Sequence, residues 1–223
     1  MLRAIIYCSV AGDIIKVMNE YIEKLKKVVK GRLVVYIDAA NLERSIQNMW
    51  VNPKDIPDNY RHMTADLLRW AADYKKFKDF FAGLGDLQGV RFYSASFGTD
   101  SHTKFLYFLK KRLNFKLTTK PLKEYGDHTL ETPHRKANFD VEMAVDATFT
   151  LNSFDTFILF SGDCDFEYLV KFLRGQGKMV IGVSRSGHIA KELPPACTHY
   201  FDIADFRKEI LQILPKKAKS PTP

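Results

Sequence analysis

Apolar residues recur along this chain with two different periods. Short continuous runs of β-branched, aromatic and leucine residues are typical of strands buried on both faces of a sheet. Longer stretches with apolar residues three and four positions apart are typical of helices that bury one side. The short runs predict strands over residues 33–37, 90–95, 115–118, 156–160, 179–183 and 199–201. The longer stretches predict helices over residues 13–30, from about 41, and over 64–81, 100–113, 138–151, 166–174, 188–193 and 205–214.

Predicted strands and helices alternate along most of the chain. Such alternation is typical of an α/β fold with a mostly parallel central sheet and helices on both of its faces. A polar stretch over residues 119–137 interrupts the alternation and is interpreted as a loop. We expect a helical extension over residues 1–32, one domain over 33–212 and a disordered basic tail over 213–223. The apolar stripe of the helix over 13–30 needs a partner, either the domain itself or a second copy of the chain in a homo-oligomer.

Composition narrows the class of protein. With 223 residues, of which 46% are hydrophobic, the chain can bury a core large enough for one domain. It has no apolar run of the roughly 18 residues that a membrane span needs, and its short apolar start is not a persuasive signal peptide. We therefore expect a cytoplasmic protein. The three cysteines, Cys8, Cys164 and Cys197, are far apart and predict free thiols, neither disulfides nor a zinc site.

The formal net charge of +8 is unevenly distributed. The first 32 residues carry +4 and residues 213–223 carry +3, which leaves the rest of the chain nearly neutral. Within that rest, residues 104–136 hold nine Lys or Arg against three acids. A basic segment directly before an acidic region indicates a polyanionic partner, although a solvated helix face explains part of such a run. Tyr125 in this segment is a candidate for stacking on a base. The candidate nucleic-acid contacts are Lys104, Lys120, Lys123, Arg135 and Lys136.

Acidic side chains follow two of the predicted strands. Asp38 ends the first strand of the expected sheet, whereas Asp163 and Asp165 follow the strand over 156–160. In a parallel sheet the loops after the strands open on one edge, and ligand sites form there. Asp140, in the first turn of the helix after the polar loop, can point into the same crevice. We therefore expect these carboxylates to share one site.

Carboxylates gathered at one edge repel each other, and without a cation some would take up protons. A hard divalent ion removes this conflict, and oxygen ligands without a nearby Cys and His set favour Mg²⁺ or Mn²⁺ over Zn²⁺. Such an ion can orient a water for attack on a phosphodiester. The expected metal ligands are Asp38, Asp140 and Asp163, the further catalytic acid is Asp165, and the supporting groups are Asn41, Asp146 and Ser161.

These residues also have ordinary structural interpretations. Asp140 alone is more simply an acid that compensates a helix dipole, and Asn41 is equally a common helix cap. Asp146 lies about 240° around the helix from Asp140, so it either supports the site from behind or pairs with a Lys or Arg. Ser161 either contacts a ligand or bonds only the loop backbone. We expect Glu142 to be structural, and we interpret the six scattered histidines as surface or structural residues.

Three segments together resemble a known family. Val35–Leu42, Lys136–Asp146 and Leu159–Phe166 are similar, in sequence, order and separation, to the NYN domain, in its LabA-like branch within the PIN-like nuclease superfamily. The resemblance spans roughly residues 33–206 and implies a Rossmann-like PIN fold with a divalent-metal ribonuclease site. By motif position it implies metal-binding roles for Asp38, Asp140 and Asp163, supporting roles for Asp165, Asp146 and Asn41, and a basic residue before the second motif at Lys136.

Two positions depart from the family pattern. Ala39 stands where the family often has Gly, and Ala137–Phe139 lacks the Gly that is common there. Both lie near the expected site and could alter how a substrate approaches, but neither removes a carboxylate.

Three functions are consistent with these observations. The first is a metal-dependent ribonuclease, with RNA as its partner and Mg²⁺ or Mn²⁺ as its cofactor. The second is a non-catalytic RNA-binding or regulatory module with the same fold. The third is a metal-dependent phosphatase, since acidic strand ends also serve that chemistry. The phosphatase is less favoured because a covalent aspartyl mechanism usually needs Asp-x-Asp after the first strand, and Asp38 is followed by Ala39 and Ala40.

Overall fold

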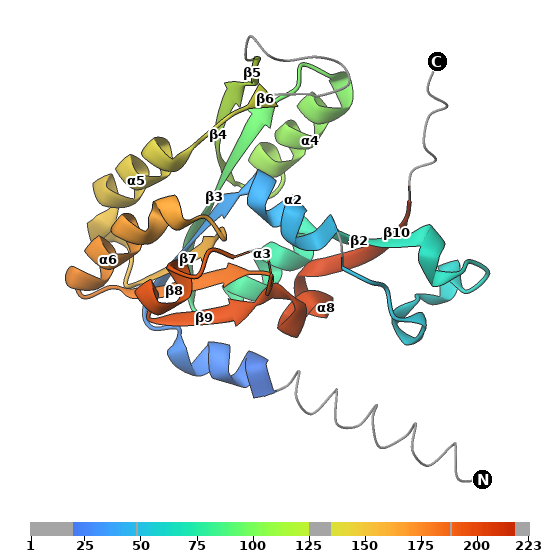
Figure 1. Ribbon diagram of the computed structural model, residues 1–223, viewed down its shortest axis with the longest axis horizontal. Helices are drawn as coiled ribbons and strands as arrows, with labels where there is room; N and C mark the ends of the chain where they lie inside the picture. The colour runs from blue at the N-terminus through green and yellow to red at the C-terminus, as the bar shows by residue number, and fades with distance from the viewer. Residues whose placement is uncertain (1–19, 48, 125–134, 188, 217–223) are drawn as a thin grey trace.

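The sheet at the centre of the molecule has six strands, and all of its neighbouring pairs are parallel. In the computed structural model, which describes residues 20–47, 49–124, 135–187 and 189–216, the strand order is β4-β3-β1-β7-β8-β9 (Figure 1). The α/β fold class with a parallel central sheet is therefore confirmed. The strands are β1 (Arg32–Asp38), β3 (Asp86–Ser96), β4 (Lys116–Pro121), β7 (Thr156–Phe160), β8 (Met179–Ser184) and β9 (His199–Asp202).

The central strand β1 shows why the sheet forms here. Its residues 33–37 are all buried. Because successive side chains of a strand point to opposite faces, Val35 packs into one hydrophobic core and Tyr36 into another. Burying a side chain of this kind contributes about 1.5–3 kcal/mol. A one-residue slip would exchange the two faces, so the alignment of β1 with its neighbours is strongly determined.

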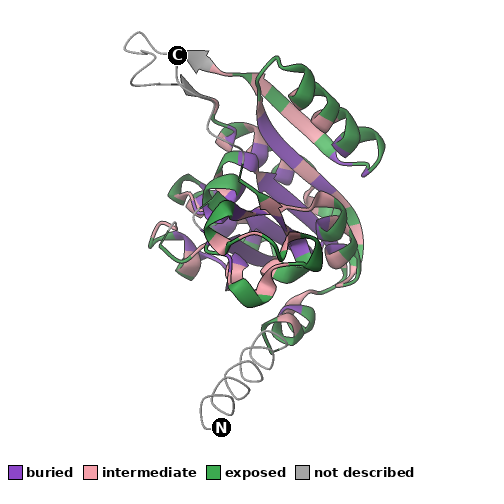
Figure 2. Ribbon diagram, turned by 90° about the vertical axis from the view of Figure 1, so that its right-hand side faces the viewer, coloured by how far each residue is buried: buried purple, intermediate pink, exposed green. Residues whose placement is uncertain are grey.

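Helices cover both faces of the sheet, as predicted. Figure 2 shows the buried strands between helices whose outer sides are exposed. The core that holds Val35 is covered by α2 (Ala39–Gln47), α3 (Tyr74–Ala82), α4 (Asp100–Lys111) and α8 (Arg207–Ile210). The core that holds Tyr36 is covered by α5 (Asp140–Phe149), α6 (Glu167–Gly175) and α7 (Leu193–Ala196).

The predicted helix over 64–81 is wrong in its first half. The chain instead forms a 3-10 turn (Ala65–Leu67) and strand β2 (Leu68–Ala72) before α3 begins. Within β2 the first and third residues are buried, which is the two-residue period of a strand. The helix starts only where the Asp73 side chain accepts hydrogen bonds from the backbone N–H groups of Lys75 and Lys76.

The predicted helix over 205–214 is also wrong in part. A 3-10 turn (Ile203–Phe206) leads into the short α8, and the chain then continues as strand β10 (Leu211–Pro215). β10 pairs with β2 in an antiparallel two-stranded sheet beside the central one (Figure 1). Among the described residues, β2 and β10 pair as strands only with each other. This long-range pairing outweighs the local helical spacing of their apolar residues.

Near the two ends of the chain, the bounds of the helix and of the tail differ from those predicted. Residues 20–28 are helical, and Leu25 is fully buried in the core that holds Val35, so this part of the N-terminal helix packs against the domain itself. The rest of the predicted helix, residues 13–19, lies outside the described residues. At the other end, the first residues of the expected tail belong to β10, and residues 217–223 lie outside the described part.

Three shorter segments also differ from the prediction. Within the expected loop over 119–137, Lys123–Glu124 (β5) pairs antiparallel with Arg135–Lys136 (β6), and residues 125–134 are not described. α5 begins at Asp140, two residues later than predicted. The helix expected over 188–193 is replaced by α7, which begins at its last residue.

Two expectations from composition can be compared with the structure. Within its described part, no helix is both long enough and apolar enough to cross a membrane. Cys164 and Cys197 are free thiols, as predicted, and Cys8 lies outside the described residues.

Candidate metal centre

Asp38, the last residue of β1, is held by the start of α2. Its Oδ1 accepts hydrogen bonds from the backbone N–H groups of Ala40 (3.0 Å) and Asn41 (3.2 Å), and its Oδ2 accepts one from Asn41 Nδ2 (2.6 Å). The Oδ1 of Asn41 in turn accepts a hydrogen bond from the backbone N–H of Gly162 (3.4 Å), in the loop after β7. Asn41 therefore ties together two strand ends that are far apart in the sequence.

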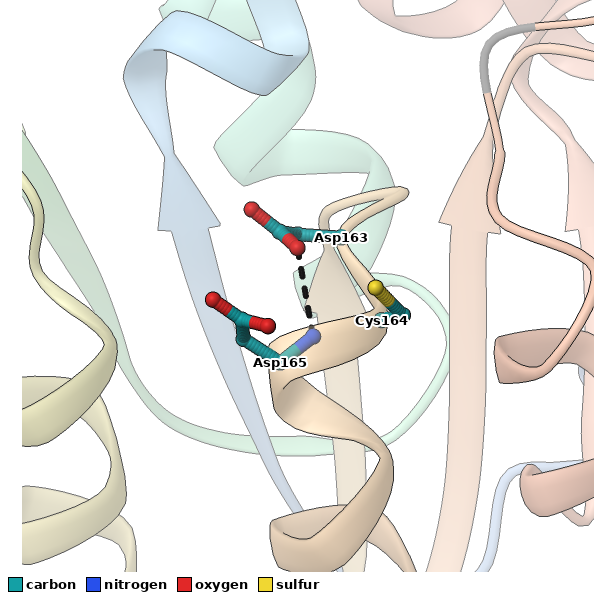
Figure 3. Close-up of side chains that lie close together, drawn as sticks. All are labelled: Asp163, Cys164 and Asp165. Carbon is teal, nitrogen blue, oxygen red and sulfur yellow. Dashed lines mark hydrogen bonds between the residues drawn. The ribbon is translucent and has the colours of Figure 1, made fainter.

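The loop after β7 brings two further carboxylates together. Ser161 is buried, and its Oγ accepts a hydrogen bond from the backbone N–H of Asp163 (3.2 Å), so Ser161 shapes the loop. The Oδ1 of Asp163 accepts one from the backbone N–H of Asp165 (3.1 Å), as Figure 3 shows. A carboxylate oxygen of each Asp and the Sγ of Cys164 lie within 4.8 Å of one another, and neither Asp38 nor Asp140 belongs to a group of three potential ligands this close among the described residues.

Asp140 brings a carboxylate from a third segment. It is the first residue of α5, and its backbone N–H donates to Asn138 Oδ1 (3.2 Å). Burial raises the pKa of the Asp140 carboxyl, and the negative charges of Asp163, Asp165 and Asp38 raise it further. Burial also raises the pKa of Asp38, where hydrogen bonds from Asn41 oppose the shift and the charge of Asp163 adds to it. The sequence-predicted acids therefore lie in one electrostatic environment.

Three of these acids line one cavity. Asp38, Asp140 and Asp163 border a space of about 440 Å³ at the carboxyl edge of the sheet. Asp165 does not line it; together with Asp140 it borders a neighbouring, smaller cavity of about 290 Å³ between α5 and α6. Asp38 and Asp163 are 125 positions apart in the sequence. They were expected to meet because the loops after parallel strands open on one edge of the sheet.

The donor groups in this cavity suit a hard divalent cation. No Lys or Arg forms an ion pair with Asp38, Asp140 or Asp163 within the described residues. Burial makes their unpaired negative charge costly, as the raised pKa values of Asp38 and Asp140 express. A divalent ion bound by carboxylate oxygens would remove this cost, and oxygen donors are the ligands that Mg²⁺ and Mn²⁺ prefer.

Asp146 lies behind the cavity and does not line it. Its Oδ2 forms an ion pair with Arg91 Nη1 (3.0 Å) and accepts a hydrogen bond from the Tyr93 hydroxyl (2.7 Å). Tyr93 stands opposite Asp38 in the pairing of β3 with β1, and it lines the cavity. Of the two roles considered for Asp146, pairing with a basic residue is therefore observed. Among the described residues, Asp146 is connected to the cavity through its hydrogen bond with the Tyr93 hydroxyl.

The basic candidates differ in their relation to the cavity. Lys120 Nζ donates to the backbone carbonyl of Asn138 (3.0 Å), forms an ion pair with Glu142 and lies over the Phe139 ring, so it stands beside the start of α5. Lys104 forms an exposed ion pair with Asp100 (2.9 Å) on α4 and does not line the cavity. The side chains of Lys123, Arg135 and Lys136, and all of Tyr125, lie outside the described part of the structure.

Several residues of the cavity wall were not predicted from the sequence. Glu43 and Arg44 lie on α2 just after Asn41, and Phe97 and His102 lie near the start of α4. The imidazole of His102 packs edge-on against Phe97, with ring centroids 4.8 Å apart, and its Nε2 is covered by protein without a hydrogen-bond partner among the described residues. α4 follows β3, which is the neighbour of β1 in the sheet. The start of α4 therefore lies at the same edge as Asp38, and this placement could have indicated His102 as a residue of the site.

Comparisons with known proteins agree with this fold. The family model of the NYN domain matches residues 32–204. The chain is 36% identical over 112 residues to the "Low amplitude and bright protein LabA" of Synechococcus elongatus, an alignment that covers 50% of this chain and 58% of that relative's length. A crystal structure of a protein of unknown function from Vibrio parahaemolyticus is similar in fold, with a TM-score of 0.55 and 17% identity over 82% of this chain and 97% of that one. The chain therefore belongs to the NYN domain family of the PIN-like nuclease superfamily, for which a nuclease-type function related to RNA is typical.

Proposed function

We propose that this protein is a divalent-metal-dependent ribonuclease that hydrolyses phosphodiester bonds at the cavity lined by Asp38, Asp140 and Asp163. The observation that carries the proposal is the convergence of these three carboxylates, from three separate segments, on one cavity. They have no basic partner among the described residues, and the pKa values of two of them are raised. Titratable groups whose pKa values are shifted by burial and neighbouring charges in a concave site are candidates for chemistry.

The cation is assigned to Asp38, Asp140 and Asp163, with Asp165 beside Asp163 as the further acid. When bound, Mg²⁺ or Mn²⁺ would supply Lewis-acid activation of a water and would offset charge on the phosphate oxygens. Without a cation these carboxylates would repel the phosphate backbone, because both groups are negatively charged. The proposed activity is therefore strictly dependent on a divalent ion.

The other residues of the site hold the acids in position. Asn41 binds Asp38 and the backbone of Gly162, so it sets the spacing between the ends of β1 and β7. Ser161 fixes the backbone at Asp163. On the other side, Lys120 stands at the start of α5, where a basic group can attract the RNA backbone once Glu142 is displaced from it. We propose that Lys123, Arg135 and Lys136, which follow β4 or precede α5, extend this contact.

The test is cleavage of single-stranded and structured RNA with Mg²⁺, Mn²⁺ or EDTA, for the natural chain and for Asp163→Asn. The matched control is Asp86→Asn, because Asp86 is an exposed acid at the start of β3, at the opposite edge of the sheet. We expect cleavage that needs the metal, is lost in Asp163→Asn and persists in Asp86→Asn.

Other outcomes contradict the proposal in distinct ways. Cleavage that survives in Asp163→Asn would place the active site elsewhere. Salt-sensitive RNA binding without cleavage by the natural chain would establish the non-catalytic module instead. Hydrolysis of a small phosphate monoester, with RNA left intact, would establish the phosphatase.

A further inference from the structure

A second cavity adjoins the one that holds the acids. Its volume is about 650 Å³, and Glu43, His102 and Phe105 line both cavities. We propose that this second cavity is a pocket for one unpaired guanine base of the RNA, next to the phosphodiester that is cleaved. This inference rests on the proposed ribonuclease function. The residues that carry it are Glu43, Arg69, Trp70, Tyr74, His102 and Phe105.

Arg69 is the first indication that the cavity receives a ligand. It lies on β2 and is half-buried, and its guanidinium forms no ion pair or hydrogen bond among the described residues. A guanidinium has five N–H donors, and leaving them without acceptors in a partly buried place is unfavourable. Arg91 and Arg207, which are also half-buried and lie beside residues of the two cavities, are paired with Asp146 and Asp55. An acceptor supplied by a ligand would satisfy Arg69 in the same way.

Glu43 supplies the opposite charge. It lies on α2, which packs beside β2 (Figure 1), and it also has no ion pair or hydrogen bond among the described residues. Burial raises the pKa of its carboxyl, while the charges of His102 and Arg69 oppose the shift. Glu43 is nevertheless exposed to solvent. Both properties are expected of a carboxylate that lies between the walls of an open cavity. The pocket thus offers separate donors and acceptors.

Apolar and aromatic groups complete the walls. Trp70 is 4% exposed, and its indole N–H is already bonded to the backbone carbonyl of Trp50 (3.2 Å), so the ring contributes an apolar surface. Tyr74 and Phe105 pack against each other with ring centroids 5.5 Å apart. Flat bases of single-stranded RNA bind on such surfaces. The Nε2 of His102 has no hydrogen-bond partner among the described residues, so a ligand in the cavity could supply one.

The mixed polarity of this pocket favours guanine over the phosphates and the other bases of RNA. A phosphate would be attracted by Arg69 but repelled by Glu43. Guanine presents the acceptors O6 and N7, which pair with an arginine fork, and next to them the donors N1–H and N2–H₂, which pair with a carboxylate. Each of the other bases offers fewer of these bonds to the same pair of side chains. The shared wall of the two cavities places this base beside the proposed cleavage site.

The test is a binding measurement without cleavage. Fluorescence anisotropy would be recorded in EDTA with oligouridine strands that carry one central guanosine, inosine, adenosine or cytidine. Inosine lacks only the N2 amino group of guanosine. We expect the natural chain to prefer guanosine over adenosine by on the order of tenfold, with inosine in between.

Variants assign the preference to the two side chains. Glu43→Gln should remove the difference between guanosine and inosine, whereas Arg69→Ala should remove most of the preference for guanosine over adenosine. Arg69→Lys keeps the charge and should lose the preference as Arg69→Ala does. This second variant tests the role of the guanidinium even if Arg69→Ala fails to fold. Glu209→Gln and Arg112→Ala are matched controls at exposed positions that line neither cavity, and both should retain the natural preference.

The outcomes separate this inference from the proposed function. Equal binding of all four strands, or a preference unchanged in both Glu43→Gln and Arg69→Lys, overturns the guanine pocket. Metal-dependent RNA cleavage together with equal binding would overturn the pocket alone. A guanosine preference without any cleavage would overturn the ribonuclease alone.

Discussion

At the amino and carboxyl ends of the neighbouring strands β1 and β7, acidic side chains have opposite electrostatic environments. At the amino end, Asp155 accepts three hydrogen bonds from Arg32: from its backbone N–H (2.9 Å), from Nε (3.1 Å) and from Nη2 (3.0 Å). These interactions lower the pKa of Asp155 to about 2. At the carboxyl end, the hydrogen-bond partners of Asp38 among the described residues are all neutral, and burial raises its pKa. The first arrangement stabilises the fold, whereas the second leaves a buried negative charge that costs stability and that we propose a cation would offset.

Replacing the acid by Asn at each of the two strand ends should have very different effects on cleavage. Asp38→Asn should reduce RNA cleavage by at least about 100-fold, because a bound metal contributes several kcal/mol to the transition state. Asp155→Asn should leave cleavage per folded molecule unchanged. Initial rates at saturating Mg²⁺, corrected for the folded fraction by circular dichroism, would measure both. Equal losses in the two variants would contradict a division of roles between the strand ends.

The next largest effect concerns the backbone at the amino end. Gly31 has a φ of +60°, and a Cβ there would lie 2.5 Å from the Oδ2 of Asp155. Gly31→Ala should therefore destabilise the protein by about 2 kcal/mol, through the left-handed backbone and the displaced carboxylate. Gly175→Ala is the control, because it lies in α6 with nothing within 4 Å of the added Cβ. Urea unfolding of both variants would measure the difference, and similar stabilities would refute the constraint at Gly31.

The stability that Asp155 contributes should depend on pH. Because folding lowers the pKa of Asp155 from 3.8 to about 2, its contribution is fully present above the unfolded value and disappears as the pH falls through the folded one. Asp155→Asn should therefore melt at a lower temperature than the natural chain at pH 7. The two melting temperatures should converge between pH 4 and pH 2, as thermal unfolding at a series of pH values would measure. A constant difference down to pH 2 would exclude this carboxylate as its cause.

The smallest effect is expected from Asp163→Asn in EDTA. Since folding raises the pKa values of Asp38 and Asp140 and the charge of Asp163 adds to both shifts, removing that charge should stabilise the metal-free protein at neutral pH by about 0.5 kcal/mol. The gain should shrink as the pH falls and the two carboxyls take up protons. Thermal unfolding would detect it, with Asp86→Asn as control. A lower melting temperature for Asp163→Asn would contradict the repulsion.

The main sheet and the meeting point of the acids could be predicted from the sequence, for one reason. Residues such as Val35 and Tyr36 are buried on both faces of β1, so the strand appears as a continuous apolar run. A parallel sheet then brings the residues after its strands to one edge, which placed Asp38 near Asp163 without any knowledge of their contacts.

The second cavity could not be predicted because its wall depends on long-range pairing. Arg69 and Trp70 belong to β2, which the spacing of apolar residues assigned to a helix. Only the partner strand β10, more than 130 residues later, gives this segment its conformation. Asp146 was difficult for a similar reason, since its partners Arg91 and Tyr93 come from another strand.

We propose that carboxylates from three segments form one cation site, which calorimetric titration with Mn²⁺ would detect. The natural chain should bind Mn²⁺, and Asp38→Asn, Asp140→Asn and Asp163→Asn should each weaken binding by about tenfold or more, while Asp86→Asn should bind like the natural chain. Equal Mn²⁺ affinity in all of these proteins, or no binding by the natural chain, would contradict the account.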